Sequence, residues 1–522
     1  MMEKRTILAV VLSTIVLLLW YRLFPPQQQA KAPVGEPAVV QAPVSTSVSA
    51  LTEEPAQKQQ VSREKEIIVD TGASEITLQT RGASVKSWKL KEDWEGDPVD
   101  LAVGKGPQLA TFPDVIYSSE TESLELTPSS PSGAVVFQHV TKEGIALIKT
   151  YSFSYGKSDA KITFDVHNKS ENINNINLSL NWGPGVGTDK EIFDSSRRSM
   201  RGLLQSGGKL NKKPKKGDYS EQIEWVAIDN QYFMIALIPA QEGASVQIDK
   251  QDKLPVFLLK RQTELSPGGY QQFSVDIFAG TKETKVLEAK GKGLEKATDY
   301  GIFAGLSRLM LNILAFFYNL TGNYGVAIVL LTLIVQIPLF PLTAKSFKSM
   351  RAMQVLQPQM TELRKKYKDD PSRLNVEIMN LYKKNKVNPF GGCLPMLLQL
   401  PIFWALFTAL RNAVELRHAP FIFWIQDLSR ADGSGVNAAF RIAGEGLPFI
   451  GNSLNILALL MGGLMFLQQK MSSTDPSQAK MVVFMPVLFT VLFWNFPSGL
   501  VLYWIVNSIV TITGQYFIVK KH

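Results

Sequence analysis

Residues 330–343 read "LLTLIVQIPLFPLT", a run apolar enough to lie in lipid that nevertheless carries Gln336 at its centre, with Pro338 and Pro341 close behind. A side-chain amide and two helix breakers are costly in hydrocarbon, because every polar group there must find a partner in the protein or in water. We therefore expect this segment to line a wet cavity inside a multi-pass membrane protein.

The apolar runs lie at the N-terminus and beyond residue 300 of the 522-residue chain. Residues 1–24 carry a basic flank and an apolar core without a cleavage site, which predicts an uncleaved transmembrane anchor. Five further runs are long enough to span a bilayer; they are roughly 324–344, 393–411, 452–469, 481–496 and 499–519. The expected fold is thus six transmembrane helices, five of them in a C-terminal core at 323–522, with both chain termini in the cytoplasm.

The cytoplasmic side is identified by charge. From Lys345 to Lys386 there are eleven Lys or Arg against four Asp or Glu, and positive charge is retained inside the cell. Nucleic-acid binding is the alternative explanation of a basic stretch, but the flanking spans favour the membrane explanation. The anionic lipids of the inner leaflet are the expected partners of these cations.

Residues 345–386 are predicted to form a cytoplasmic helical hairpin, whose second helix begins at the N-cap pair Asp370–Pro371. Its first helix has an apolar face that recurs every three or four residues: Phe347, Met350, Met353, Leu356, Met360, Leu363 and Tyr367. Packing within the hairpin is one explanation. The other is contact of Phe347, Met350, Met353 and Met360 with varied apolar segments, since Met side chains adapt their shape.

The middle of the chain has a different composition. Residues 25–60 are rich in Pro, Gln and Ala and form a flexible linker. Residues 61–285 alternate apolar and polar side chains in short segments such as "KITFDVHN", which predicts a large all-β sandwich on the outer side of the membrane. Residues 286–322 connect this domain to the core, and 301–322 is predicted to be an amphipathic helix lying at the membrane interface.

Polar side chains inside the core spans lie at similar depth. Trp504, Asn507, Thr511 and Gln515 fall on one face of the last span, and Thr332 and Gln336 share a face of the first core span. At 1.5 Å per residue, Gln336, Gln399 and Thr511 lie about 9–13 Å from the cytoplasmic ends of their spans.

Two explanations remain open for this polar set. Hydrogen bonds between membrane helices are one, at roughly 0.6 kcal/mol each. A hydrated pocket is favoured by the carbonyls that prolines free at 338, 341, 395, 401 and 486. Gly462 and Gly463 are expected to allow close helix packing.

The sequence excludes several chemistries. It has no nucleotide-binding or protease motif, its single cysteine is Cys393, and its four histidines lack metal-ligand spacing. The five core spans contain no Asp or Glu, which argues against an ion-coupled transporter. We expect neither a metal, a cofactor nor an enzymatic activity. The function that remains is that of a pocket, which lowers the free-energy cost of moving polar peptide into the bilayer.

Several motifs together resemble those of the YidC/Oxa/Alb family of membrane protein insertases, in its Gram-negative bacterial type: "KVNPFGGCLPMLLQLPIF", "VELRHAPF", "FMPVLFT" and "FPSGLVLYWIVNSIVTI". The resemblance implies a five-helix insertase core in the inner membrane, with a hydrophilic groove open to the cytoplasm, and a periplasmic β-supersandwich. It implies insertion and folding of nascent membrane proteins, alone or with the Sec translocon, without nucleotide. Thr332 and Trp504 match positions that meet the incoming segment.

The chain departs from this family at one position, because Gln336 stands where many members carry an arginine in the groove. We infer that Gln336, Gln399, Asn507 and Thr511 act through hydration and hydrogen bonding instead. Ribosome contact would use the hairpin and cytoplasmic loops. Two alternative functions are a transporter whose sandwich captures a sugar, which solute flux would reveal, and a structural assembly factor for the Sec machinery, in which groove mutations would be silent.

Overall fold

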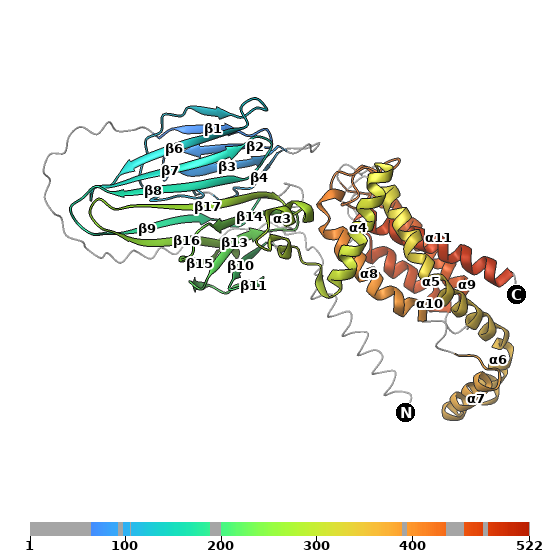
Figure 1. Cartoon of the computed structure of the whole chain (residues 1–522). Helices are drawn as coiled ribbons and strands as arrows, with labels where there is room; N and C mark the ends of the chain where they lie inside the picture. Colours follow the sequence, from blue (N-terminus) through green and yellow to red (C-terminus); the bar gives the residue numbers. More distant parts are fainter. Residues whose placement is uncertain are drawn as a thin grey trace, which may run out of the picture. The chain divides into compact units, whose positions relative to one another are not determined.

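The computed structural model describes residues 64–91, 98–104, 106–187, 200–388, 394–434, 454–472 and 479–520 (Figure 1). The predicted anchor 1–24, the linker 25–60 and Cys393 lie outside these ranges. Two compact units are distinguished, and each is described by itself: residues 356–387, and residues 62–355 together with 388–522.

The sheet domain of the larger unit contains three sheets. The first has the order β4-β3-β2-β1-β5 and comprises β1 (Glu66–Asp70), β2 (Ser74–Gln79), β3 (Ser84–Leu90), β4 (Val99–Asp100) and β5 (Ser123–Glu125). The third has the order β12-β15-β16-β9 and comprises β9 (Asn174–Trp182), β12 (Gly217–Tyr219), β15 (Ala244–Gln251) and β16 (Leu254–Leu265). Alternate residues of β9 and β15 are buried, as the period-two pattern predicts.

The second sheet has the order β11-β10-β13-β14-β17-β8-β7-β6. Its strands are β6 (Ser132–Val140), β7 (Ile145–Ser154), β8 (Ala160–Asn168), β10 (Arg201–Ser206), β11 (Lys209–Asn211), β13 (Ile223–Asp229), β14 (Phe233–Pro239) and β17 (Tyr270–Thr281). All three sheets contribute to one apolar core, in which Trp88 and Trp182 meet edge to face at 6.5 Å between ring centroids.

The eight-stranded sheet is covered on its other face by the segment that leaves the domain. Helix α3 (Thr284–Lys290) and the 3₁₀ turn η2 (Leu294–Ala297) place Leu287, Leu294 and Ala297 against Trp225 and Met234. Both faces of β14 are therefore buried, which explains why "FMIALIP" is continuously apolar rather than alternating.

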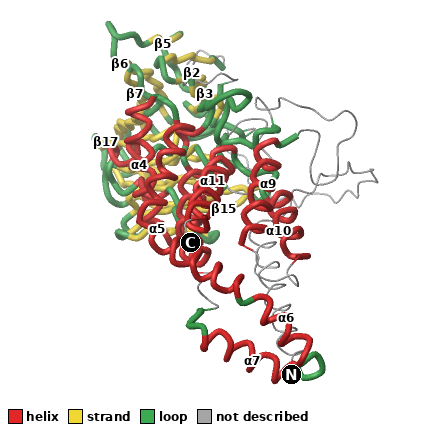
Figure 2. The backbone as a smooth tube through the Cα atoms, turned by 90° about the vertical axis from the view of Figure 1, so that its right-hand side faces the viewer, coloured by secondary structure: helices red, strands yellow, loops and turns green. Residues whose placement is uncertain are grey.

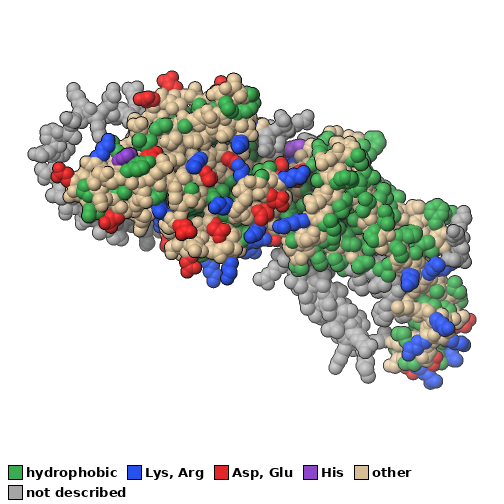
Figure 3. Space-filling view, in the orientation of Figure 1, with side chains coloured by type: hydrophobic (Ala, Val, Ile, Leu, Met, Phe, Trp, Pro, Cys, Tyr) green, Lys and Arg blue, Asp and Glu red, His purple; other side chains and the backbone are tan. Residues whose placement is uncertain are grey.

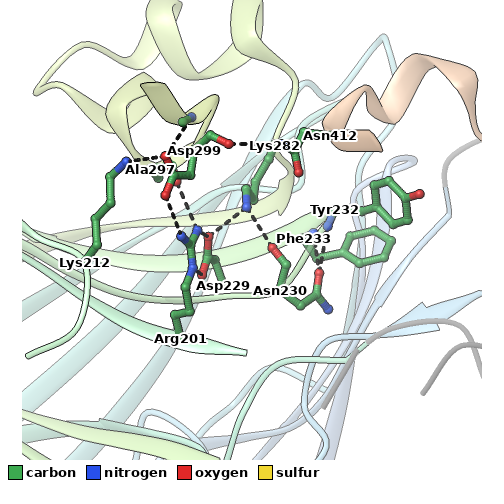
Figure 4. A network of polar contacts seen from close by, with 11 residues as sticks. Arg201, Lys212, Asp229, Asn230, Tyr232, Phe233, Lys282, Ala297, Asp299 and Asn412 are labelled. Atoms are coloured by element: carbon green, nitrogen blue, oxygen red, sulfur yellow. Dashed lines mark hydrogen bonds and ion pairs between the residues drawn. The ribbon is translucent and has the colours of Figure 1, made fainter. Parts of the chain in front are cut away.

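A buried ion cluster fastens this exit segment to the sheet (Figure 4). Asp229 is fully buried and accepts hydrogen bonds from Arg201 Nε at 3.0 Å and from Lys282 Nζ at 2.7 Å. Arg201 Nη2 also donates to Ala297 O at 3.1 Å, and Asp299 forms an ion pair with Lys212 at 3.1 Å. Opposite charges that are buried together compensate one another's lost hydration, so the cluster holds the end of the domain in one position.

Lys149 of β7 is a second buried cation, with no carboxylate partner among the described residues. Its Nζ donates to Ala83 O at 2.8 Å, Leu109 O at 2.5 Å and Thr111 Oγ1 at 3.2 Å. Ala83 and Leu109 both have positive φ, so the ammonium group ties two tight turns to the sheet. Burial lowers the pKa of Lys149 well below its usual value of 10.5.

The helical part of the larger unit begins with a 3₁₀ turn η3 (Gly301–Phe303) and α4 (Ala304–Thr321), followed by α5 (Tyr324–Val355). The remaining helices are α8 (Leu394–Asn412), the short η5 (Val414–Leu416), α9 (Ile456–Ser472), α10 (Ala479–Leu492) and α11 (Ser498–Lys520). Helix α11 contacts α5, α8 and α9, whereas α4 packs on α5 and α8. Helices α4, α5 and α11 lie side by side in Figure 2.

Three segments in the described ranges are long and apolar enough to cross a membrane: Gly301–Thr321, Tyr324–Val355 and Ser498–Ile518. Ile456–Ser472 and Val482–Leu492 are shorter apolar helices. The segment at 301–321, predicted to lie at the interface, buries Ser307, Met310, Leu314 and Phe317 on one face and leaves Leu309, Phe316 and Leu320 exposed on the other.

The predicted span 324–344 and the start of the predicted hairpin form one continuous helix. Helix α5 continues through Pro338, Pro341 and the following basic residues to Val355, so residues 345–355 belong to this helix and not to a separate hairpin helix. A proline interrupts only the hydrogen bond to the carbonyl four residues earlier, and the rest of the helical ladder persists here.

The smaller unit, residues 356–387, contains α6 (Gln357–Lys366) and α7 (Pro371–Lys384). The predicted N-cap is confirmed, since the Asp370 side chain accepts a hydrogen bond from Arg373 N at 3.0 Å. Met360 is buried, and Tyr382 Oη contacts its sulfur at 3.3 Å. Val376 and Met379 of α7 are exposed.

Gly462 and Gly463 behave differently, although both were expected to permit close packing. A Cβ on Gly462 would lie 2.0 Å from Thr490 Oγ1, so α9 and α10 approach closely at this point. A Cβ on Gly463 would meet no atom of the described structure within 4 Å. The expectation is wrong for Gly463, which lies on an open side of the helix.

We expect Gly462→Ala to lower the free energy of unfolding of the helical bundle by about 1–3 kcal/mol, as overpacking does. Thr490 would have to rotate and give up the hydrogen bond that its hydroxyl donates to Pro486 O. The matched control is Gly463→Ala, which should leave stability unchanged or raise it slightly. Thermal unfolding in detergent, followed by circular dichroism, measures both, and equal effects would contradict the assigned packing.

Lys149→Met should destabilise the sheet domain by about 1–3 kcal/mol, because the carbonyl oxygens of Ala83 and Leu109 lose their donor. Since the folded pKa of Lys149 lies below the unfolded one, the unfolded chain binds more protons between the two values. The native protein should therefore gain stability as pH rises toward 10.5, by up to about 1.4 kcal/mol per pH unit. Urea unfolding of the full chain at several pH values should show this rise, and Lys149→Met should lack it.

Candidate functional site

The polar side chains predicted inside the membrane meet along one helix, α11. Gln336 of α5 donates a hydrogen bond from Nε2 to Asn507 Oδ1. One turn further along α11, Thr511 donates from Oγ1 to Asn507 O at 2.7 Å. Gln336, Asn507 and Thr511 are all half-buried, so these three side chains are neither sealed inside the bundle nor fully exposed.

We use the name polar row for five residues that meet along α11, which are Gln336, Gln399, Tyr503, Asn507 and Thr511. Gln399 of α8 joins this row through Tyr503, a residue that the sequence analysis missed. Its Nε2 donates to the phenolic oxygen of Tyr503, which is fully buried. Tyr503 precedes Asn507 by four residues, so the two groups are about 6 Å apart along the helix axis. Its place four residues before Asn507 was the available signal, since it puts Tyr503 on the same face of the helix.

Gln515 and Thr332 are more enclosed than the sequence suggested. Gln515 is 3% exposed, and its Oε1 accepts a hydrogen bond from Ser472 Oγ of α9 at 3.5 Å. Thr332 is fully buried and donates to Ile328 O of its own helix at 2.7 Å. Neither residue lies on an accessible surface in this structure.

Trp504 belongs to an aromatic cluster beside the polar row. Its ring lies 5.1 Å from Phe403 of α8 in an edge-to-face arrangement and 5.4 Å from Phe493, with Phe489 at 6.3 Å. Trp504 itself is half-buried. The cluster fills the space between α8, α10 and α11 with rigid apolar surface, next to the amides of Gln336 and Gln399.

Three helices of the bundle continue through internal prolines, which are Pro338 and Pro341 in α5, Pro401 in α8 and Pro486 in α10. Two nearby hydroxyls donate to main-chain carbonyls, Thr343 to Leu339 O at 2.9 Å and Thr490 to Pro486 O at 2.8 Å. Serine and threonine often satisfy carbonyls in this way in membrane helices. The carbonyls that the prolines leave without a helical donor are those of residues 334 and 337 in α5, 397 in α8 and 482 in α10. The first three lie within two residues of Gln336 or Gln399 along the chain.

The loop at residues 413–434 closes one end of the bundle. Ser498 N and Gly499 N, at the start of α11, donate to Arg430 O at 2.7 Å and Leu428 O at 2.9 Å. Buried Asp432 accepts from Leu457 N at 2.8 Å and caps α9. Burial raises the pKa of this carboxyl group. The loop therefore fixes the starts of two helices that carry the polar row or pack on it.

The same end of the bundle is joined to the sheet domain. Gln231 Nε2 donates to Arg411 O at 2.7 Å, and Asn412 Nδ2 donates to Asp299 O at 3.1 Å. The guanidinium of Arg417 lies 5.0 Å from the ring centre of Tyr232, within the range of a cation–π interaction. The start of β14 and the exit segment thus both contact the end of α8 (Figure 4).

Hydrophobic side chains cover most of the visible face of the helical bundle, in contrast to the mixed surface of the sheet domain (Figure 3). Exposed members come from every core helix and include Ile337, Leu400, Leu460, Val487 and Ile509. An apolar surface of this extent suits lipid and not water. Among the described residues, no group of three or more His, Cys, Asp or Glu side chains could hold a metal ion.

The geometry permits hydrogen bonding to a polar chain but offers no reactive group. The predicted Phe347 and Met353 are buried on α5 and Met350 is half-buried, while Met360 belongs to the smaller unit. The row along α11 combines amides, hydroxyls and one phenol with a broad apolar face. Such a surface can donate hydrogen bonds to a peptide and accept them from it.

Comparisons with known proteins cover both parts of the chain. A family model described as the YidC periplasmic domain matches residues 98–313, and one described as the 60Kd inner membrane protein matches residues 316–522. A solved structure titled as an active YidC insertase aligns with 88% of this chain and 93% of its own, but at 22% identity and a TM-score of 0.39 it adds nothing to the assignment.

Relatives named "Membrane protein insertase YidC" match over their full length. The protein from Endomicrobium trichonymphae is 38% identical over 543 residues, covering 100% of this chain and 98% of its own. The one from Geotalea daltonii is 35% identical over 556 residues, covering 100% and 99%. Both family models and full-length identity of this degree lead to one conclusion: the chain belongs to the YidC family of membrane protein insertases.

Proposed function

We propose that this insertase admits the polar part of a nascent membrane protein along the α5, α8 and α11 face, and that this face is a partly hydrated groove open to the cytoplasm. The observation that carries the proposal is the row of half-buried amides and hydroxyls at Gln336, Asn507 and Thr511, next to Gln399. Polar groups at this depth lower the cost of bringing peptide into the bilayer, because peptide groups in plain hydrocarbon would have no partners.

The driving force would come from the client's own apolar segment. A charged residue at mid-membrane costs about 2.5–3.5 kcal/mol on insertion scales, while each Leu or Ile returns about 0.3–0.6 kcal/mol. A groove that reaches partway through the membrane shortens the distance over which the polar flank meets lipid. No nucleotide is then needed, in keeping with the absence of a nucleotide-binding motif from the sequence.

The closed outer end supports a groove with one opening. The loop at 413–434 holds the starts of α9 and α11 by hydrogen bonds, and Phe421 packs against Gly325 at the start of α5. A client entering from the cytoplasm would therefore leave sideways, between helices, into lipid. Trp504 and Thr332 would meet its apolar segment as α5 moves away from α11.

We further propose a six-helix topology in the inner membrane, with both termini in the cytoplasm and the sheet domain in the periplasm. The cations on the inner side, from Lys345 to Lys386, would contact anionic lipid and, through the hairpin, ribosomes. Phe347, Met350, Met353 and Met360 would contact apolar client segments before insertion. The insertase would act alone or with the Sec translocon.

Gln336→Leu should reduce client insertion severalfold while leaving the fold intact, because it removes the amide at nearly constant volume. Loss of one interhelical hydrogen bond costs only about 0.6 kcal/mol of stability. The measurement is insertion of a small single-span client into vesicles that contain the purified insertase. The matched control is Ile337→Leu at the neighbouring, largely exposed position. Normal insertion by Gln336→Leu would reduce this side chain to a packing role.

A hydrated groove also predicts which positions water can reach. With the single native cysteine replaced (Cys393→Ala), cysteines introduced at 336, 399 and 511 should react with a membrane-impermeant thiol reagent added from the cytoplasmic side. A cysteine at 332 should react far more slowly, because Thr332 is fully buried, and one at 509 should be protected by lipid. Equally slow labelling at 336, 399, 511 and 509 would contradict a hydrated groove.

A further inference from the structure

The central segments of the described bundle helices carry no formal charge. The segments 324–344, 398–410, 456–469, 482–492 and 498–518 contain no Asp, Glu, Lys, Arg or His. Their polar side chains are amides, hydroxyls, phenols and indoles, which can donate or accept hydrogen bonds but carry no formal charge with which to neutralise an ion. Any charge that a client brings to this depth would therefore lack a countercharge of either sign.

The central contact of the polar row has a distinctive hydrogen-bonding capacity. Gln336 uses one N–H to reach Asn507 Oδ1, which leaves the Gln336 carbonyl oxygen as an acceptor and the Asn507 NH₂ as a donor. Neither makes another hydrogen bond within the described part of the chain. If the two amides exchanged roles, one donor and one acceptor would still remain. Because both residues are half-buried, these atoms are within reach of an entering chain.

One free donor beside one free acceptor matches the C=O and N–H of a peptide unit. We propose that the Gln336–Asn507 amide pair binds the main chain of the client, so that this insertase admits uncharged polar segments and is indifferent to the sign of a client's charge. The inference rests on the proposed function, since it assumes that clients pass this pair. It goes further by naming the recognised group and the class of segment admitted.

A charged client would be disfavoured for a reason that does not depend on its sign. Both Asp and Lys would lose hydration on entering the groove, and both would find only dipoles there. An arginine or a glutamate at position 336 would break this symmetry, because a single fixed charge attracts one sign and repels the other at a distance of a few ångströms. Charge preference at this site is therefore created or reversed by one side chain.

The experiment uses the full-length insertase in vesicles of uncharged lipid, without a membrane potential, so that neither lipid nor voltage selects a sign. Three single-span clients differ only in two neighbouring residues of the translocated tail, which are Gln-Gln, Asp-Asp or Lys-Lys. Insertion rates should be highest for Gln-Gln and at least about tenfold lower for both charged clients, whose rates should agree within about threefold. A preference of tenfold or more for one charged client by the native protein would overturn the inference.

Variants at the amide pair make the test specific. Gln336→Arg should favour the Asp-Asp client over the Lys-Lys client by about tenfold or more, and Gln336→Glu should reverse that ratio. Gln336→Asn is the matched control. It keeps an amide, so it should insert the Asp-Asp and Lys-Lys clients at similar rates, as the native protein does. If the position 336 variants fail to fold, Asn507→Asp places a charge on the other member and should act as Gln336→Glu does. Unchanged ratios in the charged variants would refute the role of the pair.

The two proposals fail in different ways. If the Gln-Gln client does not insert, the groove is not the route of entry and the proposed function is wrong. If it inserts well and the native protein still selects one sign of charge, the groove stands and only the role of the amide pair is wrong. The ratio of the two charged clients thus reports on the pair independently of overall activity.

Discussion

Hydrocarbon offers no hydrogen bonds, and this constraint accounts for most of the membrane part of the structure. Three amide side chains of the bundle have a partner on another helix: Gln336 contacts Asn507, Gln399 contacts Tyr503 and Gln515 contacts Ser472 of α9. All three contacts converge on α11 from three different helices. Pairing and hydration are compatible here, because the two amides at 336 and 507 satisfy one another only in part and remain half-buried.

The sheet domain obeys a different constraint, since it can bury charge only where charge is compensated. Arg201 and Lys282 share the carboxylate of Asp229 and fasten the exit segment, whose Asp299 in turn accepts from Asn412 at the end of α8. Arg417 lies on the ring of Tyr232 nearby. Polar contacts therefore link the domain to the C-terminal end of α8, the helix whose N-terminal half carries Gln399.

Much of the architecture could be predicted from residue patterns. Period-two alternation located strands such as β8 and β9, and charge asymmetry located the basic hairpin. The pattern failed at β14, where both faces are buried and alternation disappears. It also did not reveal that the helix containing the predicted span 324–344 continues through two prolines to Val355. Tyr503 was missed for a related reason: its spacing was helical, but nothing local distinguished a hydrogen-bonding phenol from a packed ring.

The sequence by itself determined which residues are polar within apolar spans and that the five core spans contain no Asp or Glu, since both follow from composition and helical spacing. Tertiary structure alone decided which of those residues meet. It joined Gln336 to Asn507, buried Thr332 and Gln515, and separated the roles of Gly462 and Gly463. The reason is that helical period specifies a face, whereas the neighbour on that face depends on how helices distant in the chain pack together.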